Sequence, residues 1–284
     1  MDYNATREAL QHPEVQPTVF AGAGGPGLRP SALCAELSRL AYIRFENGDA
    51  EQAALQQALA LGGLGQAHTF STRRSGTQGF AVVSRDGQDA YVVFRGTQMD
   101  DPTDIGTDLD SRLHAWPQGG KVHTGFFNAL DSIWDAVRGW LDANPATRLW
   151  FTGHSLGAAL ATLAASRAGR ADARLVTFGS PRVGDRAFAA TFQPDRVERY
   201  VNCCDVVVFM PPDVSLGYAH IDQLSYIDHA GELHGATPAA DAIERDRASA
   251  RMHYLLEQAW RRHNVGVRDL ADHSPINYVR AFVR

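Results

Sequence analysis

One pentapeptide, GHSLG at residues 153–157, constrains the fold of this chain more than any other feature. The apolar run RLWFTG precedes it, and the alanine-rich run LGAALATLAASRA follows it. The pattern G-x-S-x-G between a strand and a helix predicts a sharp turn that lifts the serine hydroxyl above the carboxyl edge of a sheet. Glycine is expected at 153 and 157 because side chains there would collide with neighbouring backbone. Ser155 is therefore a candidate nucleophile at a helix N-terminus, where backbone amides favour developing negative charge.

Runs of strand and helix alternate along the chain on both sides of this turn. Before it, two β-rich runs flank Asp86-Gly87, a dipeptide typical of hairpin turns. After it, apolar runs predict strands over residues 173–180, 196–202 and 224–228, with a short helix near 185–193. The order strand, helix, strand, helix, strand predicts an α/β fold with a mostly parallel central sheet flanked by helices.

Longer helices are predicted in three further places. Residues 31–61 have the pattern of two helices that end at Gly62-Gly63. Another helix begins with Thr124 as its N-cap, and its apolar residues recur at helical spacing, which indicates a core face. A long helix is predicted from Thr237-Pro238 to about residue 264, because proline is favoured in the first turn of a helix.

The domain organisation predicted from these runs is simple. Residues 1–30 contain the Gly- and Pro-rich stretch AGAGGPGLRP. This composition predicts that residues 1–30 form a loosely ordered N-terminal arm. Residues 31–284 predict a single α/β domain, since no internal repeat or second domain is visible. A length of 284 residues and an apolar share of 44% suit one large domain with a sizeable core.

Charge and cysteine content exclude several classes of protein. A net charge of −5 without a dense Lys/Arg run argues against a nucleic-acid-binding protein. Three cysteines, two of them adjacent, are too few for a disulfide scaffold. No apolar run is long enough to span a bilayer. The acidic stretch DDPTDIGTDLD lacks the spacing of a calcium loop, so we expect no metal and no cofactor, and leave weak calcium binding open.

The N-terminal sequence MDYNATREAL lacks the basic and apolar regions of a signal peptide. The low cysteine count fits a reducing compartment and is also tolerated outside the cell. We therefore expect a cytoplasmic location by default, with secretion as the alternative if a signal has been removed or a non-standard route is used.

Several segments together resemble the fungal-type (class 3) lipases. In chain order they are VVFRGT, VHTGFFNAL, TGHSLGAALATLAA, VTFGSPRVGD, RYVNCCDVVVFMPP and DHSPINYV. They cover most of residues 31–284 and occur in the same order as in the family. The six segments together identify the family, whereas any one of them alone would not. The resemblance implies an α/β-hydrolase fold and hydrolysis of ester bonds in acylglycerols.

Asp205 is the candidate acid of the site. A serine nucleophile needs a base, and the base needs an acid to orient it, in the chain order serine, acid, histidine. Asp205 follows a predicted strand at the carboxyl edge of the sheet, and it matches the acid of the family by resemblance. Asp213 and Asp222 are rivals. Asp213 lies beyond Pro211-Pro212, farther from the strand end, and Asp222 lies in a predicted strand.

His273 and His220 are the candidate bases. His273 lies near the end of the chain in a predicted loop, preceded by Asp272, and the position of the base in the family favours it. His220 matches a family position that is not the base, so a buried, hydrogen-bonded histidine is expected there. His154 is expected to be a packed or hydrogen-bonded neighbour of the serine, and His123 to shape the turn before its helix.

Attack on an ester produces an oxyanion, which needs two hydrogen-bond donors. One expected donor is the backbone amide of Leu156, the residue after the nucleophile. The other is Thr97 in FRGTQ, which matches the oxyanion residue of the family and offers its amide and its hydroxyl. Arg95 is expected to form a structural ion pair. Ser180 is not a candidate nucleophile, because a proline follows it and no G-x-S-x-G surrounds it.

Three functions compete. The first is a lipid-ester hydrolase that works through Ser155, Asp205, His273 and an acyl-enzyme. The second is a phospholipase, aryl esterase or acyltransferase on the same fold, because a triad does not choose the acyl or alcohol group. The third, a non-catalytic interaction protein, is disfavoured by the intact triad positions. The expected partners are a lipid or small-molecule ester and, transiently, a lipid interface, and the oligomeric state is left open.

Residues 98–116 match the lid that follows the oxyanion strand in the resembling lipases and opens on lipid. Ile105 stands where family members commonly have a tryptophan. The apolar residues of this segment form a narrow stripe at near-helical spacing: Met99, Ile105, Leu109 and Leu113. The opposite face is densely acidic and should be repelled by anionic lipid surfaces. We therefore expect weak interfacial activation and good activity on soluble short- or medium-chain esters.

Overall fold

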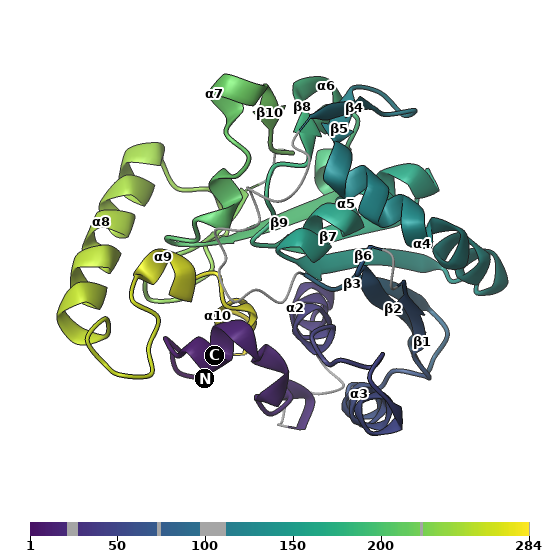
Figure 1. Cartoon of the computed structure of the whole chain (residues 1–284), viewed down its shortest axis with the longest axis horizontal. Helices are drawn as coiled ribbons and strands as arrows, with labels where there is room; N and C mark the ends of the chain where they lie inside the picture. Colours follow the sequence, from purple (N-terminus) through teal and green to yellow (C-terminus); the bar gives the residue numbers. More distant parts are fainter. Residues whose placement is uncertain (22–27, 73–74, 97–111, 222–223, 284) are drawn as a thin grey trace.

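Seven strands form one sheet at the centre of the molecule, in the order β1-β2-β3-β6-β7-β9-β11 (Figure 1). The computed structural model describes residues 1–21, 28–72, 75–96, 112–221 and 224–283. The strands are His68–Ser71 (β1), Gln78–Val83 (β2), Asp89–Phe94 (β3), Arg148–His154 (β6), Ala173–Phe178 (β7), Val197–Asn202 (β9) and Leu224–Ile227 (β11). Strands β1 to β3 pair antiparallel, and each pair from β3 to β11 is parallel. The predicted mostly parallel sheet and the hairpin at Asp86-Gly87 are both confirmed.

The central strand β6 brings a turn to the carboxyl edge of this sheet. It lies between β3 and β7, so its two faces are both covered and six of its seven residues are buried. Phe94 of β3 pairs with Gly153, and Phe178 of β7 pairs with His154. The ends of three parallel strands therefore lie beside residue 155.

Helices cover both faces of the sheet (Figure 1). On one face lie α4 (Thr124–Ala143) and α5 (Leu156–Ala168); on the other lie α2 (Pro30–Leu40), α3 (Asp49–Leu61) and α10 (Pro275–Arg280). Successive residues of a strand point to opposite faces. Accordingly, Val92 of β3 packs in the cluster with α4 and α5, whereas Tyr91 packs in the cluster with α2 and α3.

The predicted core face of α4 is confirmed, but the residue that caps the N-terminus of the helix is not the predicted one. The stripe is buried at Phe126, Leu130, Ile133, Trp134, Val137 and Leu141. His123, not Thr124, is the N-cap, since its Nδ1 accepts the N–H groups of Gly125 at 3.1 Å and Phe126 at 3.4 Å. The hydroxyl of Thr124 is used elsewhere, because it donates to the carbonyl of Arg112 at 2.7 Å.

The long C-terminal helix α8, Ala240–Glu257, is shorter than predicted at both ends. Thr237 does not cap it, because the Thr237 hydroxyl donates to the carbonyl of Leu224 at 2.6 Å. At the other end, the N–H of Gln258 bonds the carbonyl of Tyr254 and closes the helix. The predicted helix start was wrong because the threonine bonds a strand, a contact that local sequence does not reveal.

A second, smaller sheet lies beyond the carboxyl edge of the first, in the order β10-β8-β5-β4 (Figure 1). Its strands are Leu113–Ala115 (β4), Lys121–His123 (β5), Gly184–Asp185 (β8) and Tyr218–Ala219 (β10). Two short helices accompany it, Arg186–Ala189 (α6) and Asp213–Leu216 (α7). The sequence does not predict this sheet, since strands of two or three residues are too short to show a period of two.

The N-terminal segment is packed over residues 1–21, where the sequence predicts a loosely ordered arm over residues 1–30. Helix α1 (Arg7–Gln11) begins at Thr6, whose hydroxyl accepts the N–H of Ala9 at 3.2 Å. The carbonyl of Ala5 accepts the N–H of Val265 at 2.9 Å, which joins the two ends of the chain. Among the described residues, no helix combines the length and apolar character needed to cross a bilayer.

Candidate active site

Ser155 occupies a strained turn between β6 and α5. Its φ of 58° and ψ of −130° lie in a region that residues with side chains rarely adopt. Among the described residues it is the one non-glycine residue with a positive φ. A Cβ at Gly153 would lie 2.4 Å from the carbonyl carbon of Gly157, and a Cβ at Gly157 would lie 2.2 Å from the carbonyl oxygen of Phe94. Strand and helix therefore approach as closely as the sequence predicts, and the turn stores about 1–3 kcal/mol of backbone strain.

Three side chains from distant parts of the chain form a continuous hydrogen-bonded row. The Oγ of Ser155 lies 2.9 Å from Nε2 of His273. The Nδ1 of His273 lies 3.0 and 2.9 Å from the two carboxylate oxygens of Asp205. All three residues are buried. The structure thus brings together the three residues that the sequence predicts as nucleophile, base and acid.

The surroundings of Asp205 fix the orientation of the His273 ring. The carboxylate accepts the N–H of Val207 at 2.9 Å and the O–H of Tyr278 at 2.6 Å. Burial and the negative charge of Asp205 raise the pKa of Tyr278 well above its ordinary value, so Tyr278 remains a donor. Because a carboxylate only accepts, His273 donates from Nδ1, and its Nε2 lone pair faces the serine hydroxyl.

His154 supports the backbone of His273 from behind. Its Nε2 lies 2.7 Å from the carbonyl of His273, which can only accept, so this nitrogen bears the proton. Its Nδ1, 2.8 Å from the hydroxyl of Tyr42, is then the acceptor. Burial first, and the neighbouring His273 second, lower the pKa of His154 well below its ordinary value. His154 is therefore a hydrogen-bonded neighbour of the serine turn, as the sequence predicts.

The depressed pKa of His154 predicts a loss of stability in mild acid. The unfolded chain takes up a proton on this ring below about pH 6.5, whereas the folded chain does not. The proton uptake of this one ring should then lower the free energy of unfolding by about 1.4 kcal/mol per pH unit as pH drops from there toward the folded pKa, and His220, whose pKa is also lowered, adds to the slope. Chemical unfolding at a series of pH values measures this slope. His154→Gln should flatten it and the exposed His253→Gln should not; equal slopes in all three proteins would contradict the assignment.

The rival residues lie in other environments. Nε2 of His220 donates to the carbonyl of Val208 at 2.6 Å, which is the hydrogen-bonded histidine that the sequence predicts. Asp213 has an exposed side chain with its carboxylate 3.7 Å from Arg182. The hydroxyl of Ser180 donates to the carbonyl of Pro181 at 3.0 Å. None of these contacts reaches the serine, and Asp222 lies outside the described residues.

One buried cluster has the composition of a metal site. The thiols of Cys203 and Cys204 and a carboxylate oxygen of Asp272 lie within 4.8 Å of one another. The pKa of Cys203 is raised far above its ordinary value by the hydrogen bond with Cys204 and by burial, which disfavours a thiolate ligand. Asp272 is ion-paired with Arg268, whose Nε lies 3.0 Å away. This donor set fits a metal ion poorly.

Comparison with known proteins gives the same family as the sequence motifs. A family model described as "Lipase (class 3)" matches residues 91–215, the segment that contains Ser155 and Asp205. Over this segment the chain is similar to the class 3 lipases. A lipase of Rhizopus niveus is 32% identical over 174 residues, which are 56% of this chain and 44% of the relative. A secreted mono- and diacylglycerol lipase of Fusarium solani is 40% identical over 118 residues, 39% of this chain and 35% of the relative.

The fold also matches solved lipase structures. The triacylglyceride lipase of Rhizomucor miehei superposes with a TM-score of 0.59 and 25% identity, over 75% of this chain and 87% of the other. The chain therefore has the α/β-hydrolase fold. The chain spans less than half the length of the two curated relatives that it matches, 44% and 35%.

Part of the predicted catalytic machinery lies outside the described residues. Thr97, the predicted oxyanion donor, belongs to that part, and so does most of the predicted lid over 98–116. The other predicted donor, the amide of Leu156, is described and lies in the first turn of α5, where amides have no intrahelical acceptor. Arg95 pairs with Glu46 through two hydrogen bonds, 2.6 and 3.0 Å, as predicted.

Sequence reasoning missed two tyrosines of the site. Tyr42 bonds His154, and Tyr278 bonds Asp205. Tyr278 lies in the segment DHSPINYV, four residues after Ser274 and on the first helical turns after His273, so its closeness to the base could have been inferred. Tyr42 follows α2, far from the motifs, and no local signal marks it.

Proposed function

We propose that the protein is a serine carboxylic-ester hydrolase that acts on acylglycerols or similar lipid esters, with Ser155, Asp205 and His273 as its catalytic triad. The observation that carries the proposal is the row of hydrogen bonds from Ser155 Oγ through the His273 ring to the Asp205 carboxylate. The names of the Fusarium and Rhizomucor relatives, which specify mono-, di- and triacylglycerides, support this substrate class.

The geometry supports a two-step mechanism. Ser155 Oγ attacks the ester carbonyl carbon while His273 Nε2 takes its proton, and Asp205 stabilises the resulting imidazolium. The amide of Leu156, with Thr97 as the second donor, would hold the oxyanion. His273 then gives the proton to the leaving alcohol, which leaves an acyl group on Ser155. Water, activated by His273, releases the carboxylic acid.

A panel of substrates tests the substrate class. We expect hydrolysis of tri- and diacylglycerols and of soluble nitrophenyl esters, with slower hydrolysis of phospholipids and little acyl transfer to added alcohol. A phospholipase, aryl esterase or acyltransferase is the alternative function on this fold. Phospholipid turnover faster than acylglycerol turnover would overturn the proposed substrate class and leave the triad standing.

Weak interfacial activation is a further expectation for this enzyme. It follows from the acidic residues in the predicted lid sequence 98–116, because an acidic face is repelled by anionic lipid surfaces. The rate of tributyrin hydrolysis, followed across the solubility limit, should rise without a sharp jump when droplets form. A steep jump at droplet formation would contradict the expectation.

We propose in addition that residues 31–284 form one α/β-hydrolase domain, against which the N-terminal segment packs. Of the two possible locations, we favour secretion. The name of the Fusarium relative, which describes a secreted lipase, supports it. Fractionation of the producing culture, with the protein detected by antibody, separates secretion from retention in the cell.

A further inference from the structure

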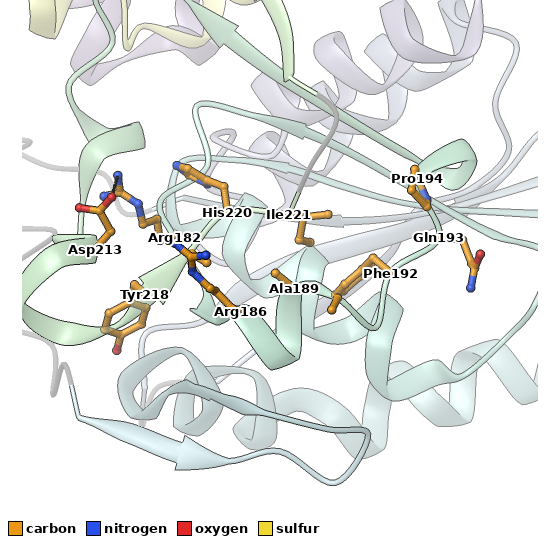
Figure 2. A pocket seen from close by; sticks show the side chains of 12 residues that line it. Arg182, Arg186, Ala189, Phe192, Gln193, Pro194, Asp213, Tyr218, His220 and Ile221 are labelled. Atoms are coloured by element: carbon orange, nitrogen blue, oxygen red, sulfur yellow. Dashed lines mark ion pairs between the residues drawn. The ribbon is translucent and has the colours of Figure 1, made fainter.

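A cavity of about 830 Å³ lies among α6, β10 and the segment before β9 (Figure 2). Its volume is within the range of small-molecule sites, roughly 300–1,000 Å³. None of Ser155, Asp205 and His273 lines it, so it is separate from the proposed triad.

One end of this cavity is cationic. Arg182 is held in place because its Nη1 donates to the carbonyls of Phe209 and Pro211, and its side chain is only 12% exposed. Its Nη2 is 3.7 Å from the carboxylate of Asp213, which is longer than a hydrogen bond. Arg186, on the same wall, has an exposed side chain, and no residue that the structure describes forms an ion pair or a side-chain hydrogen bond with it. Guanidinium donors therefore remain available to a ligand.

The other end is apolar. Ala189, Phe192 and Ile221 line it, and Figure 2 shows them on the far side of Arg186 from Asp213 and Tyr218. The cavity thus presents a cationic end and an apolar end to the same ligand, which matches a molecule with one anionic group and a hydrocarbon chain.

The charged residues that line the cavity have a net charge opposite in sign to that of the chain. The chain carries a net charge of −5, yet the charged lining is Arg182, Arg186 and Asp213, two cations and one anion. Burial and the nearby cations Arg199 and Arg182 lower the pKa of His220, which also lines the cavity. An excess of guanidinium groups favours a bound anion, and a planar carboxylate matches the guanidinium fork.

We propose that this cavity binds an amphiphilic monocarboxylate, with its carboxylate on Arg186 and Arg182 and its alkyl chain against Phe192 and Ile221. Fatty acids belong to this chemical class. The binding does not depend on the proposed esterase activity.

Calorimetric titration of the full chain with octanoate tests the proposal. Arg186→Gln should weaken octanoate binding by about tenfold or more, because it removes a charge-assisted hydrogen bond. The exposed Arg138→Gln on α4 is the matched control and should change nothing. Octanol and inorganic phosphate should each bind far more weakly than octanoate. If octanoate binds beside Ser155 instead, its affinity will be unchanged in Arg186→Gln, and that result would overturn the proposal. Equal affinity for octanol or for phosphate would also overturn it.

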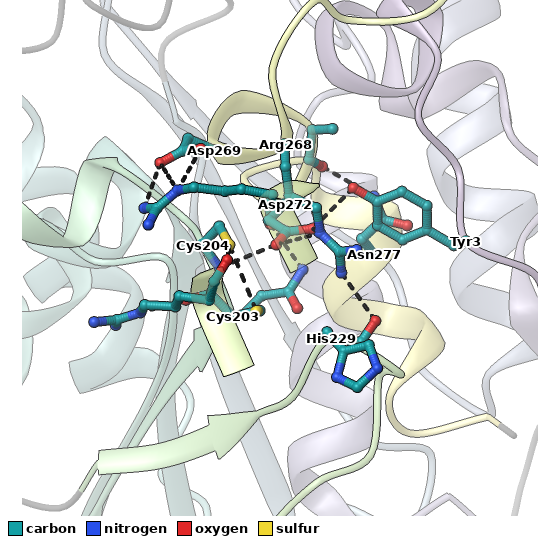
Figure 3. A network of polar contacts seen from close by, with 12 residues as sticks. Tyr3, Cys203, Cys204, His229, Arg268, Asp269, Asp272 and Asn277 are labelled. Atoms are coloured by element: carbon teal, nitrogen blue, oxygen red, sulfur yellow. Dashed lines mark hydrogen bonds and ion pairs between the residues drawn. The ribbon is translucent and has the colours of Figure 1, made fainter. Parts of the chain in front are cut away.

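A buried network of polar contacts surrounds Asp272 (Figure 3). The carboxylate of Asp272, the residue before His273, is buried and accepts four hydrogen bonds. They come from the hydroxyl of Tyr3 at 2.8 Å, from Nε of Arg268 to both oxygens at 3.0 Å, and from the N–H of Cys204 at 3.0 Å. Cys204 is the residue before Asp205, so Asp272 joins the chain beside the acid to the chain beside the base.

Further contacts make this junction rigid. The backbone carbonyl of Asp272 accepts the side-chain N–H of Asn202, at the end of β9, at 2.9 Å. Nη2 of Arg268 donates to the carbonyl of His229 at 2.9 Å. The segment that carries His273 is therefore hydrogen-bonded to the segment that carries Asp205, immediately before the two catalytic side chains. Small displacements of a catalytic group are costly in rate.

We infer that Asp272 is a positioning residue that sets the alignment of His273 with Asp205; this rests on the proposed function. Asp272→Asn should lower kcat on a soluble nitrophenyl ester by about tenfold or more and leave KM unchanged, because ester binding does not involve the network. The acid limb of the kcat–pH profile, which reports the base, should move in the same variant.

The variants are chosen to separate positioning from folding. Tyr3→Phe removes one of the four hydrogen bonds and should lower kcat less than Asp272→Asn does, with its circular dichroism spectrum unchanged. A wild-type kcat and pH profile in a folded Asp272→Asn protein would overturn the inference. If Asp272→Asn does not fold, a Tyr3→Phe protein with the wild-type kcat and pH profile would overturn it instead. Absence of ester hydrolysis by the wild-type chain would instead reject the proposed function.

Discussion

Replacing Ser155 by alanine is expected to lower kcat for ester hydrolysis by about 10⁶-fold, because the attacking oxygen is removed and no other group can form the acyl-enzyme. The hydroxyl is 2.9 Å from His273 Nε2 and makes no contact on which the strand or helix depends. Alanine keeps the Cβ of the residue, so the strained turn should persist and the thermal unfolding temperature should change little. Initial rates on nitrophenyl butyrate, with circular dichroism to verify folding, measure both effects.

Ser180→Ala is the matched control for this variant. Ser180 is also a buried serine close to the carboxyl edge of the sheet, and its hydroxyl donates only to the carbonyl of Pro181. Its replacement should leave kcat within a factor of a few of the wild-type value. A Ser155→Ala enzyme with substantial turnover, or a Ser180→Ala enzyme without it, would refute the assignment of the nucleophile.

Asp205→Asn should lower kcat by about 10⁴-fold, since the amide would favour the wrong tautomer of the base. In the wild type, the carboxylate accepts from Nδ1 of His273 and leaves the Nε2 lone pair free for the serine proton. An asparagine amide presented to Nδ1 donates instead of accepting, which places the ring proton on Nε2. The ring can then no longer take the proton of Ser155.

Asp213→Asn tests whether the effect is specific to this acid. Asp213 is exposed, and its carboxylate is 3.7 Å from Arg182 and belongs to a different part of the structure. Its replacement should leave kcat on nitrophenyl butyrate nearly unchanged. Equal losses in the two variants would show that Asp205 has no special place in the chemistry.

The parts of the fold that the sequence predicts well are those whose cause is local. Strand β6 is recognisable from RLWFTG because a strand covered on both faces is a continuous apolar run. The hairpin at Asp86-Gly87 follows from one turn dipeptide, and Gly87 indeed has a φ of +73°. The need for glycine on both sides of Ser155 is also local, because the strand and the helix meet within five residues.

The parts that the sequence does not predict depend on partners far along the chain. The hydroxyl of Tyr3 donates to the carboxylate of Asp272, 269 residues away, a contact that the sequence around Tyr3 does not reveal. Thr237 has the local signature of a helix cap, but the carbonyl of Leu224 takes its hydroxyl. Tyr42 reaches the site only because α2 packs beside β6. In each case a tertiary hydrogen bond decides what local propensity leaves open.

The central claim, that Ser155 is a nucleophile activated by His273 and Asp205, is tested most directly by covalent labelling. The protein is treated with a fluorophosphonate and digested, and the labelled peptide is mapped by mass spectrometry. We expect a single phosphonylated residue, Ser155, with labelling that is slowed severely by Asp205→Asn and unaffected by Asp213→Asn. A label on any other residue, or on Ser155 at the same rate in both variants, would contradict it.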